Sequence, residues 1–179
     1  MLPLRWTPAA PFGPAFSPLR QPGSLTARLA RHGRVTVDVL ASGWRPARAD
    51  EIHDMGIDRA GERIYARRVC VRLDGHPAVL ADSVTTRAGV NGPWRGLRNL
   101  GNRPLAALLW TAPLIGRSPF RFVRVGPDFL PLPGQERPLP ARRSRFCRGG
   151  EPLLVLECFL GLPWPRGGLL PRKRGWLKD

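Results

Sequence analysis

Two tight turns, each flanked by segments of alternating residue character, constrain the fold of this chain more than any other feature of its sequence. Asp74-Gly75 and Gly149-Gly150 each separate two such segments. Dipeptides of this kind favour the two-residue turns that join neighbouring antiparallel strands. The alternation has the period of two that a β-strand requires. We therefore expect a largely antiparallel sheet that contains two hairpins.

Six segments show the strand pattern, and stretches between them favour helices. The strands are predicted at 34–41, 64–73, 77–85, 119–125, 142–148 and 152–160. Ser24 can cap a helix that ends before Gly33, and residues 92–111 look helical in two pieces. Residues 43–61 are predicted as a polar loop. The predicted fold class is α+β, a six-stranded antiparallel sheet with helices packed on a face.

The length of 179 residues suits one domain with a single core and extensions at its ends. We predict a proline-rich extension at 1–22, a folded domain at 23–163 and a basic tail at 164–179. Prolines interrupt any apolar stretch near the start that would serve as a signal peptide, and no apolar run approaches the roughly 18 residues of a membrane span. The three cysteines form no C-x-x-C pair. We therefore expect a soluble, reduced, cytoplasmic protein.

The chain is strongly basic, with 29 Lys and Arg against 13 Asp and Glu, for a formal net charge of +16. Such an excess favours an anionic partner, either nucleic acid, acidic lipid or a small polyanion. An arginine-rich composition is equally what a GC-rich genome produces. In the tail, Arg172, Lys173, Arg174 and Lys178 lie beside Trp176. This segment is either a solvated tail or a weak contact with an anionic membrane surface.

Two charged residues lie where strand alternation predicts apolar surroundings. Glu157 is in the middle of an apolar segment, and Arg67 shares one face of its strand with Tyr65, Val69 and Val71. A buried charge must be paired or hydrogen-bonded, because isolating it from water is costly. Two interpretations are open. The two residues form a buried ion pair with each other, or they line a closed pocket in which the guanidinium grips a ligand carboxylate and the glutamate meets another polar group.

Familiar catalytic motifs are absent from the sequence. His32, His53 and His76 lie too far apart for a helical metal pair, and no cysteine or carboxylate cluster accompanies them. The chain has no G-x-G-x-x-G after a strand, no lysine-ended phosphate loop and no G-x-S-x-G elbow. We therefore expect no metal site and no dinucleotide, ATP or acyl-serine chemistry.

The chain resembles bacterial chorismate pyruvate-lyases in four ordered segments: YARRVCVRLDGHPAVLADSVTT, LGNRPLAALLW, ARRSRF and GGEPLLVLECFLGLP. The similarity runs from about residue 23 to residue 163. It implies a monomer that encloses one small aromatic ligand and needs no metal or organic cofactor. It also implies conversion of chorismate to 4-hydroxybenzoate and pyruvate, the committed step that feeds the ubiquinone ring.

The resemblance also implies site residues. The carboxylate-binding arginine of the family falls on Arg67, and its ligand-binding glutamate falls on Glu157. A main-chain contact falls on Leu105, near a helix start where unpaired N–H groups favour an oxygen acceptor. Leu25 stands where a relative has a methionine that contributes to the binding site. If that residue contacts the ligand through its backbone, leucine serves equally; if its side chain shapes the pocket, the fit of the ligand changes. The arginines of 141–146 would pair with loop carboxylates or raise the local positive potential.

Two other classes of function stay open. Effector domains of certain bacterial transcription repressors look similar to this fold and also enclose small molecules. They are joined to an N-terminal winged helix, for which the proline-rich residues 1–22 are too few. An RNA-binding protein would expose aromatic residues among arginines on its sheet, whereas Tyr65 is predicted on the apolar face. We therefore predict a chorismate lyase with no nucleic-acid partner.

Overall fold

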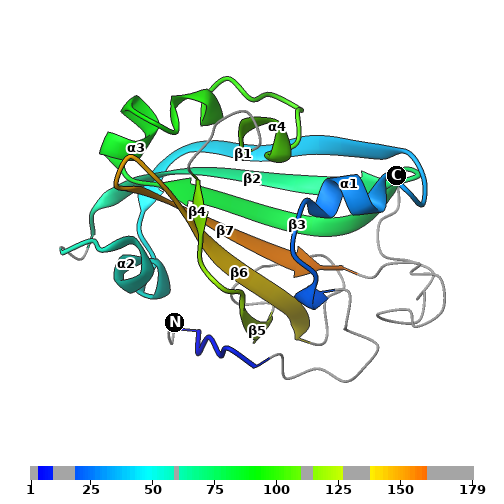
Figure 1. The fold of residues 1–179 in the computed structure, drawn as a ribbon, viewed down its shortest axis with the longest axis horizontal. Coiled ribbons are helices and arrows are strands. Elements are labelled where there is room, and N and C mark those ends of the chain that lie inside the picture. The colour runs from blue at the N-terminus through cyan, green and yellow to red at the C-terminus, as the bar shows by residue number, and fades with distance from the viewer. Residues whose placement is uncertain (1–3, 10–18, 59–60, 110–114, 127–137, 161–179) are drawn as a thin grey trace.

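One antiparallel sheet runs through the part of the chain that the structure describes. The computed structural model describes residues 4–9, 19–58, 61–109, 115–126 and 138–160. Within these residues the sheet has seven strands in the order β1-β2-β3-β7-β6-β4, with β5 also paired to β6 (Figure 1). The strands are β1 (Val35–Pro46), β2 (Arg63–Leu73), β3 (His76–Thr85), β4 (Gly116–Arg117), β5 (Arg121–Val125), β6 (Leu139–Arg148) and β7 (Glu151–Phe159).

Both predicted hairpins are confirmed, and their turns explain why the strands pair as they do. Asp74 and Gly75 have φ angles of 50° and 78° between β2 and β3. Gly149 and Gly150 have φ angles of 55° and 80° between β6 and β7. Positive φ at both central residues gives the turn a twist that matches that of the flanking strands. Each dipeptide therefore fixes the register of its hairpin.

The predicted fold class is confirmed, with a correction to the number of strands. All six predicted strands are present, and β4 adds a seventh among the described residues. It consists of Gly116 and Arg117, which pair with Cys147 and Phe146 of β6. Two residues are too few to show an alternating pattern, so this strand left no signal in the sequence.

Short helices connect the strands. They are α1 (Leu25–Leu29), α2 (Ala49–Met55), α3 (Arg87–Asn91), the 3-10 helix η2 (Arg95–Leu97) and α4 (Ala106–Leu109). Ser24 caps α1 as predicted, because its Oγ accepts a hydrogen bond from the N–H of Ala27 at 3.2 Å. The side chains of Leu25 and Leu29, one turn apart, are both buried against the sheet. The helical pieces predicted at 92–111 correspond to η2 and α4.

The prediction of a polar loop at 43–61 is wrong, because this segment holds the end of β1 and the helix α2. The polar side chains of α2 find partners on the sheet rather than in water. Arg143 of β6 pairs with Asp50 at 2.8 Å and with Asp54 at 2.6 Å. Gly56 then ends the helix in the left-handed conformation, with φ of 64°.

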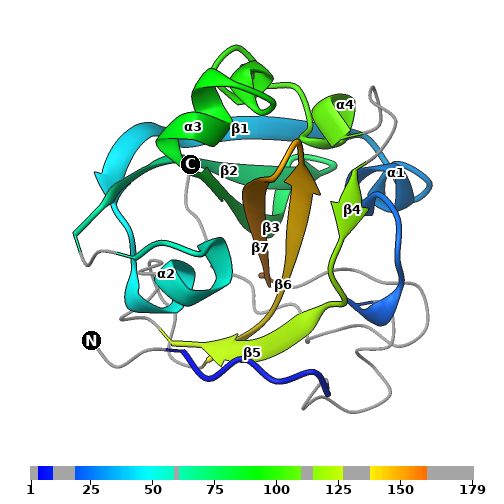
Figure 2. The same ribbon diagram turned by 60° about the vertical axis from the view of Figure 1, so that its left-hand side comes forward.

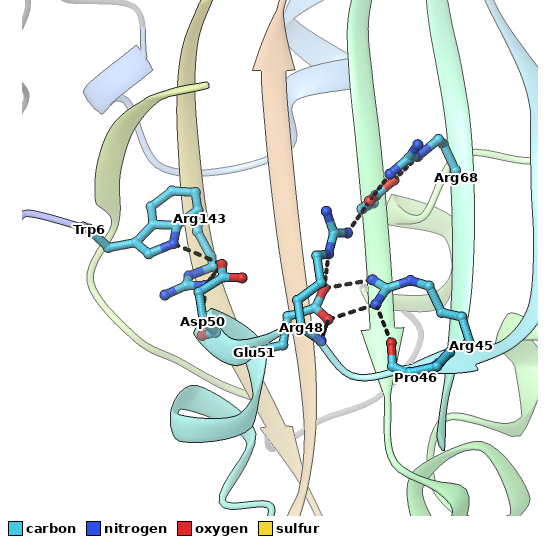
Figure 3. A network of polar contacts seen from close by, with 9 residues as sticks. Trp6, Arg45, Pro46, Arg48, Asp50, Glu51, Arg68 and Arg143 are labelled. Carbon is cyan, nitrogen blue, oxygen red and sulfur yellow. Dashed lines mark hydrogen bonds and ion pairs between the residues drawn. The ribbon is translucent and has the colours of Figure 1, made fainter. Parts of the chain in front are cut away.

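A network of ion pairs continues from α2 across the sheet (Figure 3). Glu51 accepts hydrogen bonds from the side chain of Arg45 at 2.6 and 2.7 Å and from the backbone N–H of Arg48 at 2.8 Å. Arg48 also pairs with Asp82 of β3 at 2.7 Å, and Arg68 of β2 pairs with the same carboxylate at 2.6 Å. These contacts hold α2 against the sheet.

Helices cover both faces of the sheet, whereas the sequence predicted them on one. Figures 1 and 2 show α1, α3 and α4 on one side of the sheet and α2 on the other. On the first face, Val69 and Val79 pack against Leu29 of α1. On the second face, Leu154 packs against Met55 of α2. The first face carries Arg67 and Glu157 and therefore positions the candidate site.

The segment predicted as an N-terminal extension contacts the sheet where it is described. Thr7 and Phe122 of β5 exchange backbone hydrogen bonds of 2.9 and 2.8 Å. The indole Nε1 of Trp6 donates to Asp50 at 3.0 Å. The division of the chain at residues 23 and 163 stays a prediction, and the basic tail at 164–179 lies outside the described residues.

Candidate functional site

A cavity lies between the first face of the sheet and the helices α1 and α4. The space between its walls is about 720 Å³, and this volume includes space that is open to solvent. Its walls are mainly apolar and include Val37, Val69, Val71, Val79, Val155 and Phe146. The charged groups that line it are Arg67, Arg117 and Glu157. Apolar walls with a few converging polar groups are typical of a site for one small organic molecule.

Arg67 reaches the cavity from β2 with its charge uncompensated by the described chain. The residue is 2% exposed. Its Nη2 donates to the carbonyl oxygens of Gly101 at 2.7 Å and Arg103 at 3.0 Å. Among the described residues, no carboxylate pairs with it. Burial lowers the pKa of this guanidinium. A guanidinium held in this way is suited to bind an anion that enters the cavity.

Glu157 does not pair with Arg67, so the interpretation of a buried ion pair between these two residues is wrong. Its Oε2 accepts from Nε of Arg142, which is the neighbour directly across the strand pair β6-β7. Arg142 is fully buried, and its Nη1 donates to the carbonyl oxygen of Leu19 at 2.8 Å. The side chain of Glu157 is 17% exposed and lines the cavity. The carboxylate is thus compensated by Arg142 and still accessible to a ligand.

Leu25 and Leu105 line the same cavity from the helical side. Leu25 is the first residue of α1, and Leu105 directly precedes α4. The carbonyl of Leu105 accepts from the N–H of Leu108 at 2.9 Å, while its own N–H donates to no acceptor in the described chain. The structure therefore brings together every residue that the sequence predicted for the site. The roles of these residues stay predictions.

The arginines of the segment 141–146 point to different places because successive strand residues face opposite sides. Arg142 lies on the cavity side, paired with Glu157. Arg143 lies on the other face, where Figure 3 shows it beside Asp50 and Trp6. The sequence predicted loop carboxylates as one set of partners, and those of Arg143 instead belong to a helix.

Sequence reasoning missed Ser83 and Arg117, which also line the cavity. Ser83 is 2% exposed and is the register partner of Arg67. The alternation of 77–85 would have placed it on the cavity face, so a signal for it existed. Arg117 lies on the two-residue strand β4, and no local pattern marks it.

No further catalytic group is evident in the described parts of the chain. These residues hold no group of three or more His, Cys, Asp or Glu that could bind a metal ion. None of their helices is long and apolar enough to cross a membrane. Burial raises the pKa of Cys158 to about 12 and also raises that of Cys70. Neither thiol is poised to act as a thiolate nucleophile.

The family model described as chorismate lyase matches residues 10–166. The chain belongs to the chorismate lyase family. A probable chorismate pyruvate-lyase of Bordetella pertussis is 40% identical over 183 residues, covering 93% of this chain and 95% of that protein. A probable chorismate pyruvate-lyase of Albidiferax ferrireducens is also 40% identical, over 166 residues that cover 85% of this chain and 84% of that protein. The family predicted from four sequence segments is confirmed.

Solved structures show where else this chorismate lyase fold occurs. The effector domain of PhnF from Mycobacterium smegmatis matches with a TM-score of 0.53 and 12% identity, over 76% of this chain and 88% of that one. A PhnF C-terminal domain matches with a TM-score of 0.52 and 24% identity, over 72% of this chain and 85% of that one. At these identities the likeness concerns the fold alone. The predicted similarity to effector domains is confirmed at that level.

Proposed function

We propose that the protein converts chorismate to 4-hydroxybenzoate and pyruvate. One observation carries the proposal: the buried Arg67 guanidinium, unpaired with any described carboxylate, shares one apolar cavity with the Glu157 carboxylate. Chorismate has a carboxylate on one ring carbon and a hydroxyl on the carbon opposite. A cation and a hydrogen-bond acceptor in one apolar cavity suit these two groups. The curated relatives are named for this reaction.

The cavity residues take separate roles in the proposed complex. Arg67 holds the ring carboxylate through charge-assisted hydrogen bonds. Glu157, already paired with Arg142, accepts a hydrogen bond from the ring hydroxyl. The free N–H of Leu105 donates to a substrate oxygen, and Leu25 packs against the ring. Together these contacts orient a rigid ring in one direction.

The chemistry that follows asks little more of the protein. The ether bond between the ring and the enolpyruvyl group breaks, and its electron pair leaves with the pyruvyl oxygen. The ring carbon that bears the hydroxyl loses its hydrogen, and the electrons of that bond complete the aromatic ring. The hydrogen ends on the methylene carbon of the enolpyruvyl group, which becomes pyruvate. Glu157 carries it there as a proton, or it passes directly within the substrate.

Aromatisation makes this step strongly downhill, so the protein chiefly has to orient and desolvate the substrate. We therefore propose that no metal or organic cofactor takes part. Activity should survive exhaustive dialysis against a chelator. Loss of turnover that a divalent cation restores would refute this part of the proposal.

The place of the reaction in the cell is also part of the proposal. 4-Hydroxybenzoate would supply the ring of ubiquinone, and the protein would act as a monomer in the cytoplasm. The apolar cavity that binds the substrate should also bind the product, which keeps the ring, its carboxylate and its hydroxyl oxygen. Product is therefore expected to slow turnover as it accumulates.

A second candidate is a domain that senses a small molecule without reacting with it. The observation that favours it is the fold shared with the PhnF effector domain. In that function the same cavity would hold an anionic ligand, and the ligand would leave unchanged. Family membership favours the enzyme.

One experiment distinguishes the two functions. The purified protein is incubated with chorismate, 4-hydroxybenzoate is separated by chromatography, and pyruvate is measured with lactate dehydrogenase. We expect the two products in equal amounts and at a rate proportional to protein concentration. Tight binding of 4-hydroxybenzoate without release of pyruvate above the uncatalysed rate would favour the sensor and refute the enzyme.

A further inference from the structure

Among the described residues, three arginines lie around Glu157, the carboxylate that lines the cavity. Arg142 pairs with Glu157. Burial lowers the pKa of Arg117; Glu157 opposes this effect, and Arg142 and Arg28 add to it. Burial and Arg142 likewise lower the pKa of Arg28, and Glu157 opposes them. Within the described chain, no other carboxylate pairs with any of the three. The cluster therefore has more positive than negative charge.

Several donors of this cluster lack acceptors. Nε and Nη2 of Arg28 and Nη2 of Arg142 are buried without a hydrogen-bond partner in the described chain. Nη1 of Arg28 donates to the carbonyl oxygens of Gln21 at 2.7 Å and Pro22 at 2.9 Å. A buried donor left without a partner is unfavourable, because it has lost its hydrogen bonds to water. An anion bound nearby would reduce the electrostatic part of this cost.

Arg117 is the member of the cluster that reaches the cavity. Its Nε donates to Oγ of Ser144 at 3.2 Å. The guanidinium carbon lies 4.1 Å from the ring centroid of Phe120 and 5.0 Å from that of Phe146. Neither of its two Nη groups donates to an acceptor in the described chain, so both are available to a ligand. The two aromatic rings hold the guanidinium in place.

We propose that Arg117, with Arg28 and Arg142 as supporting charges, forms a second carboxylate subsite that binds the carboxylate of the enolpyruvyl group. This inference rests on the proposed function. In chorismate the ether carbon is next to the carbon that bears the hydroxyl. If Glu157 holds the hydroxyl, the enolpyruvyl group must therefore lie near Glu157, where the cluster is.

The two carboxylates of the substrate then meet two different arginines. Arg67 lies on β2 and Arg117 on β4, and these strands are separated in the sheet by β3, β7 and β6. The ring carboxylate stays with the product, whereas the second carboxylate leaves with pyruvate. Arg117 therefore distinguishes substrate from product, while Arg67 binds both.

Two unreactive probes test the subsite. Both are 4-hydroxybenzoates substituted next to the hydroxyl, one with a carboxymethoxy group and the other with an ethoxy group of similar size and no charge. In titration calorimetry, the wild type should bind the carboxymethoxy probe at least about tenfold more tightly than the ethoxy probe, as one charge-assisted contact predicts. In Arg117→Met this preference should disappear, while the affinity for 4-hydroxybenzoate should change by less than about threefold. Arg117→Lys keeps the charge and should retain part of the preference.

A matched control removes the same charge elsewhere. Arg34 is exposed and directly precedes β1, and Arg34→Met should keep the full preference. No preference in the wild type, an unchanged preference in Arg117→Met, or an equal loss for all ligands in that variant would overturn the subsite. Chorismate turnover by the wild type is measured separately. Its absence would refute the proposed function, whereas the preference between the probes decides the subsite on its own.

Discussion

Replacing Arg67 with methionine should separate ligand binding from stability. Methionine is of similar length but has no charge, so it removes the contact with the ring carboxylate. Two charge-assisted hydrogen bonds at about 1.5 kcal/mol each give about 3 kcal/mol, which corresponds to a roughly 100-fold rise in the Kd of 4-hydroxybenzoate. The affinity for chorismate should fall similarly, since both ligands have this carboxylate.

The effect on stability should be smaller, because two contributions oppose each other. The variant loses the hydrogen bonds from Nη2 to the carbonyl oxygens of Gly101 and Arg103, at 2.7 and 3.0 Å. It also removes a charge whose burial is unfavourable and which no described carboxylate compensates. We expect a net loss of about 1 kcal/mol, or about 3 °C in Tm for a chain of this length.

The assay is titration calorimetry with 4-hydroxybenzoate, with the folded fraction measured by circular dichroism. The matched control is Arg72→Met on the same strand, which breaks a partly exposed 2.5 Å pair with Asp38. The control should bind normally and lose at most about 1 kcal/mol of stability. Unchanged affinity per folded molecule in Arg67→Met would refute the assignment. Equal weakening in both variants would show that net charge, and not this contact, controls binding.

Glu157→Gln keeps the shape of the side chain and a hydrogen-bond acceptor but removes the charge. Turnover should fall at least about tenfold, while binding of 4-hydroxybenzoate is partly retained. Wild-type turnover per folded molecule would contradict the role assigned to Glu157. Burial raises the pKa of Asp82, but its two arginine partners lower it more, so its folded-state pKa is depressed. Its contribution to stability is then full above about pH 4 and lost as the pH falls further, and Tm should fall less steeply with acid in Asp82→Asn than in the wild type. Because the pKa of Cys158 is about 12, iodoacetamide at pH 8 should label it only after unfolding; labelling of the folded protein, seen by mass spectrometry, would contradict its burial. If the basic tail touches membranes, deletion of residues 164–179 should reduce salt-sensitive cosedimentation with anionic vesicles, and unchanged cosedimentation would exclude that contact.

The strands and hairpins could be predicted because their causes are local. Turn dipeptides such as Asp74-Gly75 adopt positive φ at both positions, and alternation shows which side chains face inward. The same alternation placed Arg67 on the interior face, where the structure has it. The family motifs then brought Leu25 and Leu105 into the predicted site, and all of these residues line one cavity.

The helix α2 could not be predicted in the same way. Its sequence is short and polar, and its stabilising partners come from strands far along the chain. Asp50 and Asp54 are held by Arg143, which follows them by about 90 residues in sequence but lies 2.8 and 2.6 Å away in space. A local pattern contains no information about such a partner, so the segment looked like a loop.

The electrostatics of the cavity likewise depend on the assembled sheet. Alternation and family motifs indicated that Arg67 and Glu157 belong to the interior, but they left open whether the two pair with each other. The register of β6 against β7 places Arg142 opposite Glu157 and so leaves Arg67 unpaired by the described chain. Arg117 enters through a two-residue strand that exists only because β6 offers it an edge. For Arg67 and Glu157 the sequence determined the place on the interior face, because that place follows from periodicity. Only the tertiary structure decided which charges meet, because ion pairs form between residues that the fold brings within a few ångströms of one another.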